Sequence, residues 1–304
     1  MFTALLQLVV LVCIGVVVQH LIFLPFGIGN VRRILTGLVY YLLLPALILQ
    51  ATWKSALPSD FGWIILIAAI CVIVPFLGIY YYGRWQKLSS TMLGATLLAG
   101  SFPNTTYMGI PILGEIFGAW TRNLIIAYDQ MSCMPLILTL GVTIASRLGN
   151  HEKIEPPHRA LSKVPALWAG LTGLILFQIG LPIPNVINFT LNSLASAVSP
   201  IMLIALGMAL ELKKMDRQTF EIANLLALMQ LIIVPLCAYL LSRWVGMTGE
   251  MLQAMTLEAA MPSMIFGLVL CDRFDLDAHF YARIVTYTTA LSLISLPLIY
   301  ILVS

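Results

Sequence analysis

Long apolar stretches follow one another along the whole chain, and short polar segments separate them. Each stretch is long enough to cross a hydrocarbon core of roughly 30 Å as a helix. Because they are continuous and do not alternate every second residue, they exclude a transmembrane β-barrel. The pattern predicts an all-α integral membrane protein with ten transmembrane helices. The expected spans are residues 3–24, 34–51, 62–82, 91–116, 121–146, 164–181, 186–211, 219–243, 251–271 and 280–303.

The chain contains one pattern twice. Residues 73–103 and 233–262 share Ile-Val-Pro, then Arg-Trp, then a methionine eleven residues before a proline, at an offset of 159–160. A polar linker at 147–163 separates five spans from five, so the second unit enters the membrane from the opposite side. Two repeats of inverted topology, at 1–146 and 164–304, are typical of secondary transporters, whose substrate site lies where the repeats meet.

Composition and charge agree with a membrane location. Apolar residues make up 60% of the chain and charged residues 10%, with a mean hydropathy of +0.97. The net charge of +3 gives no basis for a nucleic-acid partner. Of the 16 basic residues, Lys54, Arg122 and Arg243 fall on one side of the predicted topology and all the others on the opposite side. By the positive-inside rule both termini are extracytoplasmic. The short loops favour a bacterial inner membrane.

Spans 4 and 9 are interrupted at corresponding positions. Span 4 contains Ser-Phe-Pro-Asn-Thr-Thr near its middle, and span 9 contains Met-Pro-Ser-Met. A proline removes a backbone donor and breaks a helix, so each span predicts two half-helices with an unwound turn. The N-terminus of a half-helix attracts anions such as carboxylates. The predicted substrate site, with Ser263 in the place of Asn104, consists of Pro103, Asn104, Thr105, Thr106, Pro262, Ser263 and Met264. Asn104, Thr105 or Thr106 is expected to cap the second half-helix of span 4.

Two carboxylates fall inside predicted spans, Asp129 in span 5 and Glu258 four residues before the span 9 proline. Intramembrane carboxylates are functional candidates, here for coupling to H⁺ or Na⁺. The alternative is a carboxylate in an outer vestibule or hydrogen-bonded to a neighbouring helix. Gln50 and Gln130 are weaker candidates for the same site. The five cysteines have no metal-ligand spacing, so neither a metal site nor another cofactor is expected.

The segments FPNTTYMGIPILGEIFG and MPSMIFGLVLCDRFDLD carry a specific resemblance. The first resembles the fourth-span motif of the auxin efflux carrier family, which includes plant PIN exporters and bacterial malate and malonate permeases. The second, with the last span, resembles that family's ninth and tenth spans. The resemblance implies a crossover fold like that of bile-acid symporters and sodium/proton antiporters. It also implies a homodimer, a scaffold of spans 1, 2, 6 and 7, and a transport domain of spans 3–5 and 8–10. Matching positions carry over Pro103, Pro262 and the substrate-contacting Asn104.

These features favour a secondary transporter that carries small organic anions, such as malate, malonate or auxin-like acids, by alternating access around the span 4/9 crossover. The alternative is a sodium or proton antiporter of the same architecture with no organic substrate. Ion flux in the absence of an organic anion discriminates the two. The chain has no metalloprotease motif and no nucleophile elbow, so an enzyme is not expected.

Overall fold

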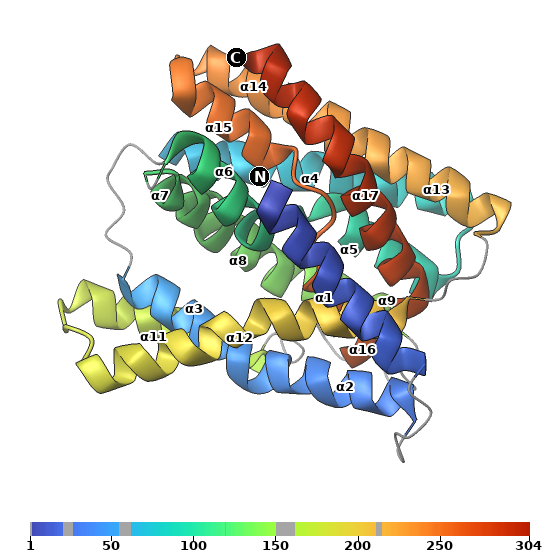
Figure 1. Ribbon diagram of the computed structural model, residues 1–304, viewed down its shortest axis with the longest axis horizontal. Coiled ribbons are helices and arrows are strands. Elements are labelled where there is room, and N and C mark those ends of the chain that lie inside the picture. The colour runs from blue at the N-terminus through green and yellow to red at the C-terminus, as the bar shows by residue number, and fades with distance from the viewer. Residues whose placement is uncertain (1, 21–26, 55–61, 119, 150–161, 211–214) are drawn as a thin grey trace.

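The apolar stretches form helices throughout the computed structural model, which describes residues 2–20, 27–54, 62–118, 120–149, 162–210 and 215–304. All regular elements in these ranges are helical (Figure 1). Six continuous helical stretches are long and apolar enough to cross a membrane: Ile28–Lys54, Gly62–Trp85, Thr121–Leu148, Asn185–Ala209, Arg217–Trp244 and Ala278–Val303. Two shorter apolar helices cover Val9–His20 and Pro165–Gln178.

Several of the long stretches change locally from α-helix to π-helix, which is written η here. The elements are α1 Phe2–His20, α2 Ile28–Leu38, η1 Val39–Leu43, α3 Leu44–Lys54, α4 Gly62–Trp85, α5 Ser90–Ser101, η3 Thr105–Gly109, α6 Ile110–Phe117, α7 Thr121–Ile125, η4 Ile126–Cys133, α8 Met134–Leu136, η5 Ile137–Gly141, α9 Val142–Leu148, α11 Pro165–Gln178, α12 Asn185–Ala209, α13 Arg217–Leu228, η6 Met229–Ile233, α14 Val234–Trp244, α15 Gly249–Ala259, α16 Gly267–Arg273 and α17 Ala278–Val303.

One group of helices, formed by α1, α2, α3, α11 and α12, packs largely against itself (Figure 1). Glycines let these helices approach closely. A Cβ atom on Gly207 of α12 would lie 2.1 Å from the carbonyl oxygen of Val12 in α1, and one on Gly173 of α11 would lie 2.0 Å from Thr52 Oγ1 in α3. Small residues at crossings are the usual way in which membrane helices maximise contact, because lipid provides no hydrophobic drive between them.

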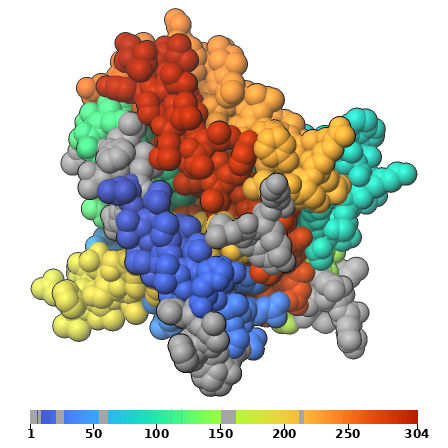
Figure 2. Space-filling model, turned by 45° about the vertical axis from the view of Figure 1, so that its right-hand side comes forward, coloured from blue at the N-terminus to red at the C-terminus, as the bar shows by residue number. Residues whose placement is uncertain are grey.

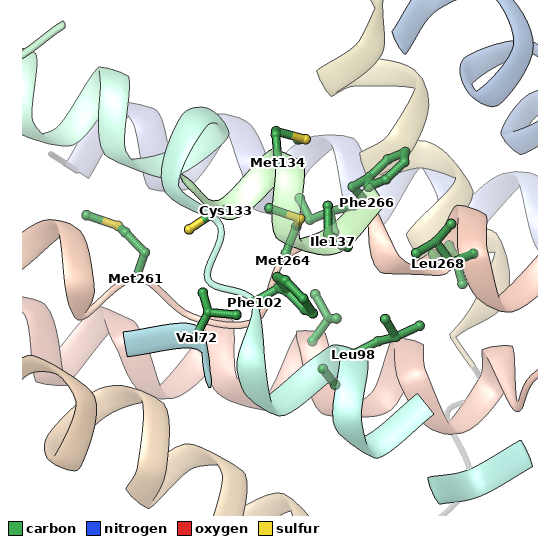
Figure 3. Close-up of a cluster of buried hydrophobic side chains, with 14 of the residues drawn as sticks. Val72, Leu98, Phe102, Cys133, Met134, Ile137, Met261, Met264, Phe266 and Leu268 are labelled. Atoms are coloured by element: carbon green, nitrogen blue, oxygen red, sulfur yellow. The ribbon is translucent and has the colours of Figure 1, made fainter. Parts of the chain in front are cut away.

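The other elements form a second group, in which α4 packs on α5, η4 and α14, and α17 packs on α5, α13 and α15. The buried apolar side chains concentrate here. Figure 3 shows Leu98, Phe102, Met264 and Phe266 converging where two non-helical segments pass each other. The core therefore surrounds the chain breaks that the sequence predicts in spans 4 and 9.

Helix bounds differ from the predicted spans mainly in the second one. The sequence places it at 34–51, whereas the helix runs from Ile28 to Lys54. The added first turns contain Arg32, which is buried because its guanidinium binds Asp272 of α16. Most of the predicted linker at 147–163 lies outside the described residues.

Candidate functional site

The helix of span 4 stops at Ser101, as the proline after Phe102 predicts. A residue that precedes proline is driven out of the helical region, and Phe102 is extended, with φ −110° and ψ 113°. Pro103 has no N–H to continue the hydrogen-bond ladder. The chain becomes helical again at Thr105, in the π-helical turn η3 that leads into α6.

The second interruption is longer. Helix α15 ends at Ala259 and α16 begins only at Gly267. The two breaks pair with each other in an antiparallel bridge between Pro103 and Ser263. The N–H of Asn104 donates to the Pro262 carbonyl at 2.7 Å, and the N–H of Met264 donates to the Phe102 carbonyl at 2.8 Å (Figure 3). Each break thus satisfies backbone groups of the other, which hydrocarbon cannot do.

The bridge shows which residues of the two segments lie opposite each other. Pro103 lies opposite Ser263, and Asn104 and Met264 are the two donors. The sequence alignment puts Ser263 in the place of Asn104, and this correspondence between the repeats stays a prediction.

Side chains of neighbouring helices hold the crossover in place. Gln230 of η6 donates to the Ala99 carbonyl at 2.8 Å and accepts from the Ser263 hydroxyl at 2.7 Å. Thr288 of α17 donates to Ser263 Oγ at 3.0 Å, and the Tyr281 hydroxyl donates to the Met264 carbonyl. The sequence reasoning missed these supports. The signal was a glutamine in one apolar span and a group of threonines in another, since polar side chains are costly there unless bonded.

Asn104 follows the bridge and is 1% exposed, and neither its amide oxygen nor its amide nitrogen has a hydrogen-bond partner in the part of the chain that the structure describes. It stands at the N-cap position of η3, yet its side chain makes no capping bond, so the predicted cap is wrong. Instead it lines a largely apolar cavity of about 490 Å³ between α1, α12 and α17. Figure 2 shows α1 and α17 side by side on this face. The amide is therefore left available to a ligand in that cavity.

Asp129 lies in η4 and is completely buried beside the first break. Its carboxylate accepts from the Thr105 hydroxyl at 2.7 Å, from the Thr106 hydroxyl, and from Gln130 Nε2 at 2.8 Å. These bonds explain why the threonines do not cap η3. They also link the carboxylate directly to the segment that follows the crossover.

Glu258 is the penultimate residue of α15, about one turn before Pro262, and is also completely buried. Both of its carboxylate oxygens lack a hydrogen-bond partner among the described residues. The carboxylate rests against η3, since a Cβ atom on Gly109 would lie 2.3 Å from Glu258 Oε2. It is close enough to Asp129 for the two to interact electrostatically. Two carboxylates therefore flank the same half-helix with no basic side chain bonded to either in the described chain.

Apolar membrane-length helices around two interrupted, mutually paired segments define a membrane transporter, and comparison with known proteins agrees. A family model described as "Membrane transport protein" matches residues 1–300. An uncharacterized transporter of Methanothermobacter thermautotrophicus is 30% identical over 267 residues, covering 87% of this chain and 86% of the relative. The chain therefore belongs to this membrane transport family, the auxin efflux carriers.

Two further relatives span the breadth of the family. The uncharacterized transporter YfdV of Escherichia coli K12 is 26% identical over 236 residues, which are 75% of this chain and 73% of YfdV. Auxin efflux carrier component 6 of Arabidopsis thaliana is 28% identical over 149 residues, which are 47% of this chain but 26% of the plant protein. The relatives are transporters and not enzymes, as the sequence predicts.

Proposed function

We propose that this protein is a secondary carrier of small organic anions that works by alternating access around the crossover. The observation that carries the proposal is Asn104, a buried amide with no hydrogen-bond partner among the described residues, which lines a cavity directly after a broken helix. Leaving such a group unpaired costs free energy that a ligand recovers on binding. The amide N–H₂ and the unwound backbone suit a carboxylate, and Thr105, Thr106, Pro262, Ser263 and Met264 complete the site around Pro103.

The proposed architecture is ten spans in two inverted repeats, residues 1–146 and 164–304. The sequence offset of 159–160 supports it, as does the pairing of the two breaks, whose centres are 160 positions apart. The division into a scaffold of spans 1, 2, 6 and 7 and a transport domain of spans 3–5 and 8–10 is supported by the way α1, α2, α3, α11 and α12 pack on one another. Movement of one group past the other would expose the crossover alternately to each side.

Asp129 and Glu258 are the proposed coupling groups, for H⁺ or Na⁺. Asp129 binds both threonines of η3, so a change in its protonation or ion occupancy would act directly on the substrate site. The unpartnered oxygens of Glu258 favour a role in binding a proton or cation. The same observation supports the second candidate function, a sodium or proton antiporter with no organic substrate.

The proposed setting is a bacterial inner membrane, with both termini extracytoplasmic and the chain forming a homodimer. The distribution of basic residues supports this orientation.

The decisive experiment measures uptake of labelled malonate, malate and indole-3-acetate into proteoliposomes, with and without pH and sodium gradients. Saturable uptake in the wild type, lost in Asn104→Ala, supports the carrier. Asn192→Ala, an exposed position on α12, is the matched control and should transport normally. Ion exchange without uptake of any organic acid would favour the antiporter, and normal uptake by a well-folded Asn104→Ala protein would remove that residue from the site.

A further inference from the structure

A second cavity, distinct from the one that Asn104 lines, opens between the end of α3 and the α7–η4 segment. Its volume is about 160 Å³. Thr106 and Gln130 line it, and these are two of the three residues that bind Asp129. The cavity therefore leads from the rim of the helices to the polar groups beside the crossover.

Two cationic side chains line this cavity, Lys54 at the end of α3 and Arg122 at the start of α7. Both are exposed, and neither forms an ion pair with any residue that the structure describes. Among the described residues, no acidic side chain lines the cavity. Two of the three basic residues on the predicted extracytoplasmic side thus converge on one opening, where like charges repel unless an anion lies between them.

The interior adds hydrogen-bonding groups to these charges. Gln130 is 6% exposed, and its amide oxygen has no partner within the described ranges, although its Nε2 donates to Asp129. Gln50 lines the opposite wall, with its Nε2 3.3 Å from the side-chain oxygen of Asn188. A ligand held by the two cations would meet an acceptor deeper inside, which suits a hydroxyl or a protonated carboxyl group.

We propose that Lys54 and Arg122 form the anion-recognition site of the extracytoplasmic entrance and select small dicarboxylates over monocarboxylates. A guanidinium binds a carboxylate through two parallel hydrogen bonds, and an ammonium supplies a second point charge for the other end. Ligand pockets for drug-sized molecules measure about 300–1,000 Å³, so a cavity about half the lower bound takes only a compact ligand. This inference rests on the proposed function and names the substrate class of the same pathway.

One test measures local anion recruitment independently of transport. Asn123→Cys places a thiol on the cavity wall, in a background in which the two cysteines with exposed surface, Cys13 and Cys237, are replaced by alanine. The reagents are a negatively charged sulfonatoethyl and a positively charged trimethylammonioethyl methanethiosulfonate, added from outside. The anionic reagent should react about tenfold faster than the cationic one, relative to a free thiol. Adding Lys54→Gln and Arg122→Gln should remove this preference, whereas an unchanged ratio would overturn the proposal.

The second test measures selectivity in transport. In proteoliposomes the KM for external malonate should rise about tenfold or more in the Lys54→Gln/Arg122→Gln protein, with kcat nearly unchanged and little effect on propionate. Arg243→Gln removes the third basic residue of this side, which lies against Tyr239, and should leave both values as in the wild type. Equal effects of Arg243→Gln, or equal losses for malonate and propionate, would refute selection by the two cations.

The two tests separate the proposals from each other. If the anionic reagent reacts faster in a protein that carries no organic acid, the anion site is supported and the carrier function is rejected. If malonate is taken up, but the double variant has the same ratio of reagent rates and the same KM as the wild type, the carrier function is supported and this entrance site is rejected.

Discussion

The ion pair between α2 and α16 allows a quantitative test of the packing. Asp272 accepts from Arg32 Nη2 at 2.8 Å and Nε at 3.2 Å, and from the Thr36 hydroxyl at 3.1 Å. The two charged side chains are only 7% and 4% exposed. Asp272→Asn keeps the shape but leaves the Arg32 guanidinium buried without a counter-charge. Breaking a buried pair in this way costs about 3–5 kcal/mol.

The chain provides its own control next to this pair. Arg33 binds Asp275 between the same two segments at the same 2.8 Å, but these side chains are 57% and 41% exposed. An exposed pair contributes about 0–1 kcal/mol. Asp275 has a positive φ of 51°, which asparagine tolerates, so Asp275→Asn changes the charge without adding backbone strain.

Thermal unfolding in detergent can be followed by the reaction of the buried thiols of Cys71 and Cys133 with a fluorogenic maleimide. At about 2–4 °C per kcal/mol, Asp272→Asn should lower Tm by about 6–20 °C and Asp275→Asn by no more than about 4 °C. Replacing both partners with apolar residues, Arg32→Met with Asp272→Leu, should recover most of the loss, since it also removes the desolvated charge. Equal Tm losses for the two asparagine variants, or no recovery in the apolar double variant, would show that burial does not set the strength of this pair.

Three further changes test other parts of the structure. Glu258→Gln should remove the pH or sodium dependence of uptake in proteoliposomes, and an unchanged ion dependence would exclude this carboxylate from coupling. Gly207→Ala should destabilise the α1–α12 crossing by about 1–3 kcal/mol in the thiol unfolding assay, whereas Gly37→Ala, which meets no atom within 4 Å, should behave as the wild type. The Thr219 hydroxyl and N–H donate to Asp216 and hold the pKa of that carboxyl below its ordinary value. Asp216→Ala should therefore reduce hydrogen-exchange protection of the first turn of α13 near neutral pH. The difference in protection between variant and wild type should vanish as pH falls through the folded-state pKa of Asp216. A difference in protection that persists in acid would contradict the capping role of the Asp216 carboxylate.

The sequence predicts the membrane class and the broken spans well, because apolar runs and prolines act locally. Pro103 disfavours a helical conformation at Phe102, so a break near Ser101 is favoured by neighbours in sequence. The proline alone does not decide it, since Pro75, Pro200 and Pro297 lie inside helices. The partners across the breaks are not local. The register of the bridge depends on backbone groups 160 positions apart, which place Pro103 opposite Ser263 and join the N–H of Asn104 to the Pro262 carbonyl.

The side chains that hold the crossover in place are less predictable, because they come from helices distant in sequence. Gln230 and Thr288 each contact Ser263 from another helix, and no spacing along the chain relates them. The sequence uses Arg32 only as one of the basic residues that set the orientation in the membrane, although it is buried against Asp272. The convergence of Lys54 and Arg122 likewise depends on how α3 packs beside α7. Long-range contacts decide the partners of polar residues, whereas composition decides only that such residues need partners.

The backbone pairing between the breaks also constrains the order of events during synthesis. Among the described residues, the N–H of Asn104 has no acceptor until Pro262 has been made, and the Phe102 carbonyl has only a 3.5 Å contact from Gln230 until Met264 follows. At about 5–20 residues per second, roughly 160 further residues require about 8–30 s. Throughout that interval the backbone groups at the first break lack these hydrogen bonds while they lie in or beside the bilayer. A truncated chain that ends before α15 should therefore be retained by the insertion machinery or degraded, and the two halves are expected to become stable only together.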